Sequence, residues 1–99
     1  MTEIIKNFQD LRIWQKGIEV IKDIYILTKK FPKEELCGLT SLMRRAAVSV
    51  PSYIVEGCAR DSQADYICFL YIAFGSLREL RYQLSLSKRL GFFAYTGRI

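Results

Sequence analysis

Apolar residues recur every three or four positions along most of this chain, which is the spacing of one face of an α-helix. The first stripe is the clearest, because Leu11, Trp14 and the apolar residues that follow alternate with charged and amide side chains. Two further stripes with the same spacing come later in the sequence. The pattern therefore predicts an all-α protein with three main helices, at about 11–30, 41–59 and 63–90.

Local signals mark the ends of these helices. Asp10 is expected to be the N-cap of the first helix, Ser62 resembles the start of a capping box, and Gly91 is expected to stop the third helix. Pro51 lies inside the second helix, where it removes a hydrogen bond and should kink the axis. The apolar and aromatic residues after Gly91 (Phe92, Phe93 and Tyr95) are expected to dock on the core.

The third predicted helix is apolar nearly all round in its first half. Its main stripe includes Leu70 and Leu77, yet Ile67, Tyr71 and Phe74 lie off that stripe. Such a helix has to be covered on more than one side, and three helices in one 99-residue domain (residues 1–99) cannot easily do this. The sequence therefore predicts a homo-oligomer, in which a partner subunit supplies the missing cover.

Composition excludes several classes of protein. The chain has no histidine, and its three cysteines (Cys37, Cys58 and Cys68) form no CxxC pair, so neither a metal site nor a disulfide framework is expected. We expect the cysteines to be small buried side chains in a reducing cytoplasm. The N-terminus is not a signal peptide, and the longest apolar run is about half the length of a membrane span, so no membrane association is expected.

No constellation of catalytic residues is present. Histidine is the commonest general base, and it is missing. Ser85 and Lys88 match the bare S-x-x-K pattern of a serine–lysine nucleophile, but the companion motifs are missing. No glycine-rich phosphate loop occurs either. The sequence therefore predicts a protein that is not an enzyme and that has no catalytic residues and no cofactor.

Positive charge is concentrated in the second part of the chain. The net charge is +5, and residues 40–99 hold eight Lys/Arg against four Asp/Glu. Arg78, Arg81, Lys88 and Arg89 lie roughly along one side of the third helix, where they are candidates to contact the phosphates of RNA or DNA. The same row is also explained as a solvated helix face. We expect no aromatic side chain to interleave with these cations, as stacking on single-stranded nucleic acid would require.

Two arginines stand next to each other near the start of the second helix. Arg44 and Arg45 point about 100° apart, so at most one of them faces the core. The first interpretation is a structural ion pair with Glu56 or Glu79 across the helix interface. Contact with a phosphate is the alternative.

Several segments together resemble a known family in order and spacing. They are residues 11–16, 31–32, 35–40, 44–51, 54, 56–57, 65–66, 69–70, 73, 75–76, 79, 83–84 and 90–92. The most specific is Arg-Arg-Ala-Ala-Val-Ser-Val-Pro at 44–51, followed by Glu56-Gly57. The chain thus resembles the bacterial four-helix-bundle proteins encoded by intervening sequences in 23S ribosomal RNA genes, which are related to the accessory protein of diversity-generating retroelements.

The resemblance implies an antiparallel, up-down bundle of the four-helix type that assembles into a ring-like homopentamer. The retroelement relative is basic and engages a reverse transcriptase and nucleic acid, and no catalytic motif is carried over. The family's arginine pair falls on Arg44 and Arg45, and its acidic positions fall on Glu56 and Glu79. Family members continue past Gly91 into a fourth helix, which is expected to be missing or truncated here.

Two functions follow as hypotheses. The first is a non-enzymatic, homo-oligomeric accessory protein that associates with RNA through its basic surface. The alternative is a structural or protein-interaction module that binds no nucleic acid and uses its apolar helices to recognise a protein partner.

Overall fold

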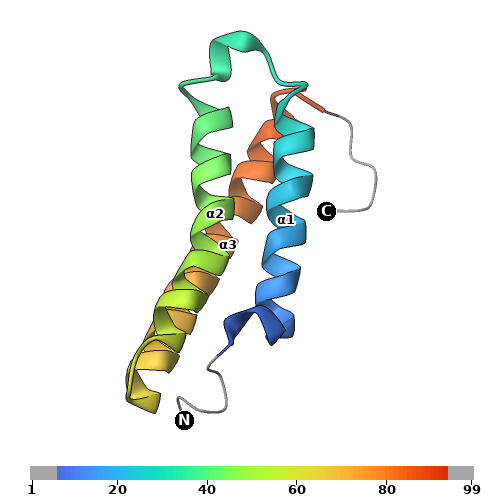
Figure 1. Cartoon of the computed structure of the whole chain (residues 1–99). Coiled ribbons are helices and arrows are strands. Elements are labelled where there is room, and N and C mark those ends of the chain that lie inside the picture. The colour runs from blue at the N-terminus through green and yellow to red at the C-terminus, as the bar shows by residue number, and fades with distance from the viewer. Residues whose placement is uncertain (1–6, 94–99) are drawn as a thin grey trace.

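The computed structural model describes residues 7–93, which form three long α-helices joined by short segments (Figure 1). The long helices are α1 (Arg12–Thr28), α2 (Leu39–Cys58) and α3 (Gln63–Arg89). Two short 3-10 helices, η1 (Phe8–Asp10) and η2 (Lys33–Glu35), precede α1 and α2. The three predicted helices are confirmed, each to within two residues of its expected ends.

The helices run alternately up, down and up, so that α2 is antiparallel to both of its neighbours (Figure 1). Helix α2 packs against α1 on one side and against α3 on the other, whereas the backbones of α1 and α3 stay apart. The predicted bundle is therefore confirmed, and between residues 7 and 93 it has three helices and no fourth. The side of the bundle between α1 and α3 consequently lacks a covering helix.

The core lies along α2 in two clusters. The first is centred on Ile24, Met43 and Leu80, which come from α1, α2 and α3 respectively and are almost completely buried. The second is centred on Ile54 of α2 and Ala73 of α3. The buried faces differ in part from the stripes read from the sequence. Helix α1 buries Gly17, Ile24 and Thr28, whereas Leu11 and Trp14 are only partly buried. Helix α3 buries Leu80, whereas Leu77 is 41% exposed.

The small residues of the α1–α2 contact allow a close approach at Pro51. A Cβ atom built on Gly17 of α1 would lie 3.2 Å from the Cβ atom of Pro51. Helix α2 continues through Pro51, although the carbonyl of Ala47 can receive no hydrogen bond from a proline nitrogen. In Figure 1 the axis of α2 bends partway along its length, as expected for an internal proline.

Both ends of α3 lie where the sequence signals predicted them. The Ser62 hydroxyl accepts a hydrogen bond from the backbone N–H of Asp65 (3.0 Å), and Gly91 ends the helix with a φ of 80°. Beyond Gly91, the rings of Phe92 and Phe93 pack against the buried ring of Phe31, with centroids 5.3 and 6.4 Å away. The predicted docking of these two rings is confirmed, and Tyr95 lies outside the described residues.

Two local predictions are wrong. Asp10 does not cap α1, because it ends η1, and the N-cap of α1 is Leu11, which makes no side-chain cap. The cysteines are not buried as a group, since Cys37 and Cys68 are exposed and Cys58 is half-buried. Cys37 lies in the loop before α2, and Cys68 lies on the side of α3 that faces away from α2.

Candidate functional site

The described residues hold no arrangement of side chains that would support metal binding. No group of three His, Cys, Asp or Glu side chains comes together in residues 7–93. Ser85 and Lys88, the two members of the S-x-x-K pattern, are both exposed on α3. None of the helices in this part of the chain has the length and apolarity that a membrane crossing requires.

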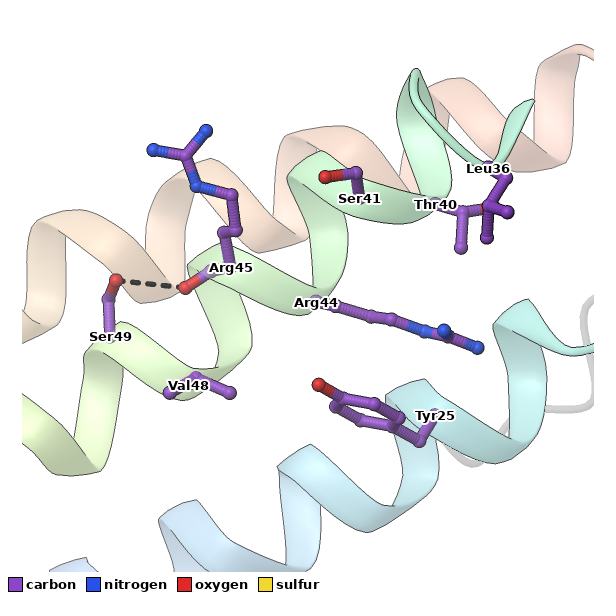
Figure 2. Close-up of a pocket in the computed structure, with 8 residues that line it drawn as sticks. All are labelled: Tyr25, Leu36, Thr40, Ser41, Arg44, Arg45, Val48 and Ser49. Carbon is purple, nitrogen blue, oxygen red and sulfur yellow. Dashed lines mark hydrogen bonds between the residues drawn. The ribbon is translucent and has the colours of Figure 1, made fainter. Parts of the chain in front are cut away.

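Arg44 links α2 to α1. Its Nε–H donates a hydrogen bond to Oγ1 of Thr28 (2.9 Å), and its Cζ lies 4.6 Å from the centroid of the Tyr25 ring. The buried Thr28 hydroxyl in turn donates to the carbonyl of Ile24 (2.7 Å). Figure 2 shows the Arg44 side chain extended across the gap between the helices, above the Tyr25 ring. Arg44 of α2 is thus held by two residues of α1, the Thr28 hydroxyl and the Tyr25 ring.

Arg44 lies in an open hollow between α1, α2 and the loop before α2. The cavity volume is about 560 Å³. The lining residues are Tyr25, Leu36, Thr40, Ser41, Arg44, Arg45, Val48 and Ser49, and none of them is acidic. Arg45 points away from Arg44 (Figure 2), and the Ser49 hydroxyl donates to the Arg45 carbonyl (2.8 Å). The hollow is therefore positively charged where Arg44 and Arg45 line it, and Tyr25, Leu36 and Val48 make the rest of it largely apolar.

The ion pairs proposed for the two arginines do not form in the single chain. Glu56 instead pairs with Arg60, four residues later on the same helix, at 3.1 Å. Twelve residues separate Arg44 from Glu56 along α2, which is about 18 Å, so the two side chains cannot meet. Glu79 is exposed on α3, and in the described part of the chain it has no ion pair.

The four candidate cations on α3 are all exposed, but they do not share one row. Arg78 and Arg89 lie on what we call the outward row, which follows the spacing 71–75–78–82–85–89 and faces away from α2. Arg81 and Lys88 belong to the neighbouring flank, which follows the spacing 67–70–74–77–81–84–88. Both rows have the alternating steps of four and three residues that keep side chains on one side of a helix. The structure therefore divides the predicted basic stripe into two pairs.

The outward row also contains two aromatic side chains that sequence reasoning missed. The exposed fractions of Tyr71 and Tyr82 are 72% and 65%. Tyr82 stands one turn after Arg78 and two turns before Arg89, so the prediction that no aromatic residue interleaves with the cations is wrong. Helical spacing alone aligns Tyr82 with Arg78 and Arg89 rather than with its neighbour Arg81. The packing of α3 adds that this side of the helix is exposed.

The neighbouring flank is apolar in the first half of α3. Ile67, Phe74 and Leu77 are each more than two-fifths exposed, and the Phe74 side chain is 47% exposed. We call these three residues the apolar flank. Their exposure follows from the missing contact between α1 and α3, and it agrees with the expectation that this helix is apolar beyond the face that it buries.

The chain matches a known protein family. A search of curated proteins returned no match. The family model described as "23S rRNA-intervening sequence protein" matches residues 9–96, which is most of the chain and includes all three helices. With its all-helical bundle, the chain therefore belongs to the family of 23S rRNA-intervening sequence proteins.

Proposed function

We propose that this protein is a non-enzymatic, homo-oligomeric accessory protein that associates with RNA through the basic surface of α3. The observation that carries the proposal is the set of exposed cations on the second half of that helix: Arg78, Arg81, Lys88 and Arg89. A cytoplasmic location is part of the same proposal, since free thiols persist in a reducing compartment.

Three of the four candidate cations on α3 are available to a ligand. Arg78, Arg81 and Arg89 make no hydrogen bond or ion pair within residues 7–93. Glu79 is the only acidic residue on the second half of the helix, and it lies on a different side from the outward row. Guanidinium groups suit phosphate oxygens because they donate two hydrogen bonds in a planar arrangement. A nucleic-acid backbone is therefore the partner that this surface fits best.

Self-association is the second part of the proposal, and the apolar flank of α3 supports it. Ile67, Phe74 and Leu77 follow the steps of seven and three residues that helix-packing seams use, and nothing in the described chain covers them. A pentamer is the favoured state, because the resemblance to the family implies one. A closed assembly would repeat the basic surface of α3 on every subunit and so raise its apparent affinity for a long RNA.

A salt titration tests the nucleic-acid part. Fluorescence anisotropy of a labelled single-stranded RNA and a labelled RNA duplex should show binding at about 50 mM salt that is lost by about 0.5 M. The double variant Arg78→Glu/Arg81→Glu should weaken binding and lower the salt slope. Lys16→Glu/Lys22→Glu on α1 is the matched control, because it changes the net charge equally on exposed residues away from α3. Absence of binding at low salt would refute the proposal.

The alternative function is a structural or protein-interaction module, and the same apolar flank favours it. In that case the working surface is the flank, recognised by an amphipathic helix of a partner protein. The variant Arg78→Glu/Arg81→Glu should then leave capture of that partner intact, while RNA binding is absent from the wild type. Loss of capture in this variant would count against the alternative.

A further inference from the structure

The outward row of α3 has an unusual composition for a solvated helix face. Its six members (Tyr71, Gly75, Arg78, Tyr82, Ser85 and Arg89) are all exposed, and none of them is acidic or aliphatic. A face that serves only solubility usually mixes charges of both signs. A face that serves only self-association is also enriched in tyrosine and arginine, but it is built around an apolar centre, and the apolar residues of α3 lie on the neighbouring flank and not in the outward row. The outward row matches neither description.

The two tyrosines of this row are not needed by the core. The side of α3 that faces α2 already supplies Ala73 and Leu80, both almost completely buried. Tyr71 and Tyr82 lie on the far side of the helix, and neither ring takes part in a described aromatic pair. Exposed tyrosine rings offer a flat face at low entropic cost. Their position therefore favours a ligand with flat groups that can stack on the rings.

The spacing of the row alternates rings with positive charges. Arg78 and Tyr82 are four residues apart, which puts their Cβ atoms about 6 Å apart on one side of the helix. Tyr71 and Tyr82 are eleven residues apart, which is about 16 Å along the axis. Between them, a Cβ atom built on Gly75 would meet no other atom within 4 Å, so a ligand can approach the backbone there.

From this arrangement we propose that the outward row binds single-stranded RNA, with unpaired bases stacked on Tyr71 and Tyr82 and phosphates held by Arg78 and Arg89. Arg81 and Lys88, on the neighbouring flank, contribute only general electrostatic attraction. The inference rests on the proposed association with RNA and adds the strand type and the residues that stack. Duplex RNA is a poor ligand for the rings, because its bases are paired and shielded from side chains.

The test uses the full chain and two labelled probes, an oligoadenylate of roughly 12 nucleotides and the duplex that it forms with oligouridylate. Tyr82→Ala should weaken binding of the single strand by at least about five-fold, since base–aromatic stacking contributes that much per base. Tyr82→Phe should bind like the wild type because it keeps the ring. Tyr82→Ala should leave duplex binding within about two-fold. Arg78→Gln should weaken single-strand binding more than Arg81→Gln, which removes the same charge from the neighbouring flank.

Each contrary result identifies which claim fails. If the wild type binds both probes equally and Tyr82→Ala has no effect, stacking is refuted while association with RNA stands. If the wild type binds neither probe, the proposed function fails, and the inference fails with it. If Tyr82→Ala changes the molar mass of the particle in light scattering, the outward row is a self-association surface and the proposal is overturned. Circular dichroism confirms that the variants keep the helical fold.

Discussion

The side chain of Arg44 on α2 donates its Nε–H to the hydroxyl of Thr28 on α1 at 2.9 Å. This is a bond between a charged donor and a buried acceptor, 16 residues apart in sequence, and it joins α2 to α1. The Tyr25 ring below the guanidinium, at 4.6 Å, adds a cation–π contact. The arginine that the sequence suggested for an ion pair thus pairs with a hydroxyl and a ring.

Replacement of Thr28 should therefore destabilise the bundle. Thr28→Val keeps the shape but removes the acceptor of Arg44, and we expect a loss of about 1–2 kcal/mol in the free energy of unfolding. Urea denaturation followed by circular dichroism measures it. Arg45→Met is the control, because the exposed Arg45 side chain should change stability by less than about 0.5 kcal/mol. Additive effects of Thr28→Val and Arg44→Met in the double variant would show that the two residues are not coupled.

Two glycine-to-alanine changes should have opposite signs. Alanine is preferred over glycine inside a helix by about 1 kcal/mol, so Gly75→Ala, in open space on α3, should stabilise the protein by up to that amount. At Gly17 the added methyl group would meet three atoms of the Pro51 ring at 3.2–3.5 Å. The ring belongs to α2 and cannot rotate away, so the methyl group should push α1 away from α2. Gly17→Ala should therefore not stabilise the protein, despite the helix preference for alanine. Equal stabilisation by both changes, in thermal or urea unfolding, would contradict the close approach.

The three cysteines should differ in their reactivity toward an alkylating reagent. Cys37 and Cys68 are exposed, whereas Cys58 is half-buried and desolvation raises the pKa of its thiol. Because the thiolate is the reactive form, Cys58 should be modified more slowly than the other two at about pH 8. Peptide mass spectrometry after timed alkylation measures each rate. Equal rates in the folded protein would show that Cys58 is open to solvent. Slow modification of Cys68 as well would indicate that a neighbouring subunit covers it.

Stability should fall at alkaline pH. Burial raises the pKa of the Cys58 thiol, and burial followed by the charge of Cys58 raises the pKa of Tyr66. Both groups therefore ionise more easily in the unfolded chain, so the stability that they contribute is complete below their unfolded pKa values and declines as pH rises through roughly 8.5 to 10 and above. The urea midpoint should drop over this range. Cys58→Ala should reduce the drop, and an unchanged drop would assign it to other groups.

Substitution in the apolar flank should change the state of association. Phe74→Glu places a charge at the centre of the flank, where Phe74 is 47% exposed, and should convert an assembly into monomers of 11.5 kDa. Light scattering coupled to size exclusion measures the molar mass. Leu42→Glu is the matched control, because Leu42 is equally exposed but lies on α2. An unchanged mass for Phe74→Glu would show that subunits meet elsewhere.

The sequence alone determined which segments are helical and where they end. Apolar spacing predicted α1, α2 and α3 to within two residues, and Ser62 and Gly91 marked the ends of α3, because caps and periodicity act within a few residues of the chain. The family, too, could be inferred from motifs such as the one at residues 44–51. Asp10 is the exception: the sequence suggested it as the N-cap of α1, but it is the last residue of the short η1 helix.

Only the tertiary structure decided which side of each helix meets which neighbour. A helix that is apolar nearly all round has no unique buried face in its sequence, so the division of α3 into a buried side, an apolar flank and an outward row required the packing of α2. The same holds for Arg44, whose partner Thr28 is on another helix. Helical periodicity gives the angle at which a side chain leaves the helix axis. The residue that it meets at that angle depends on how the helices pack.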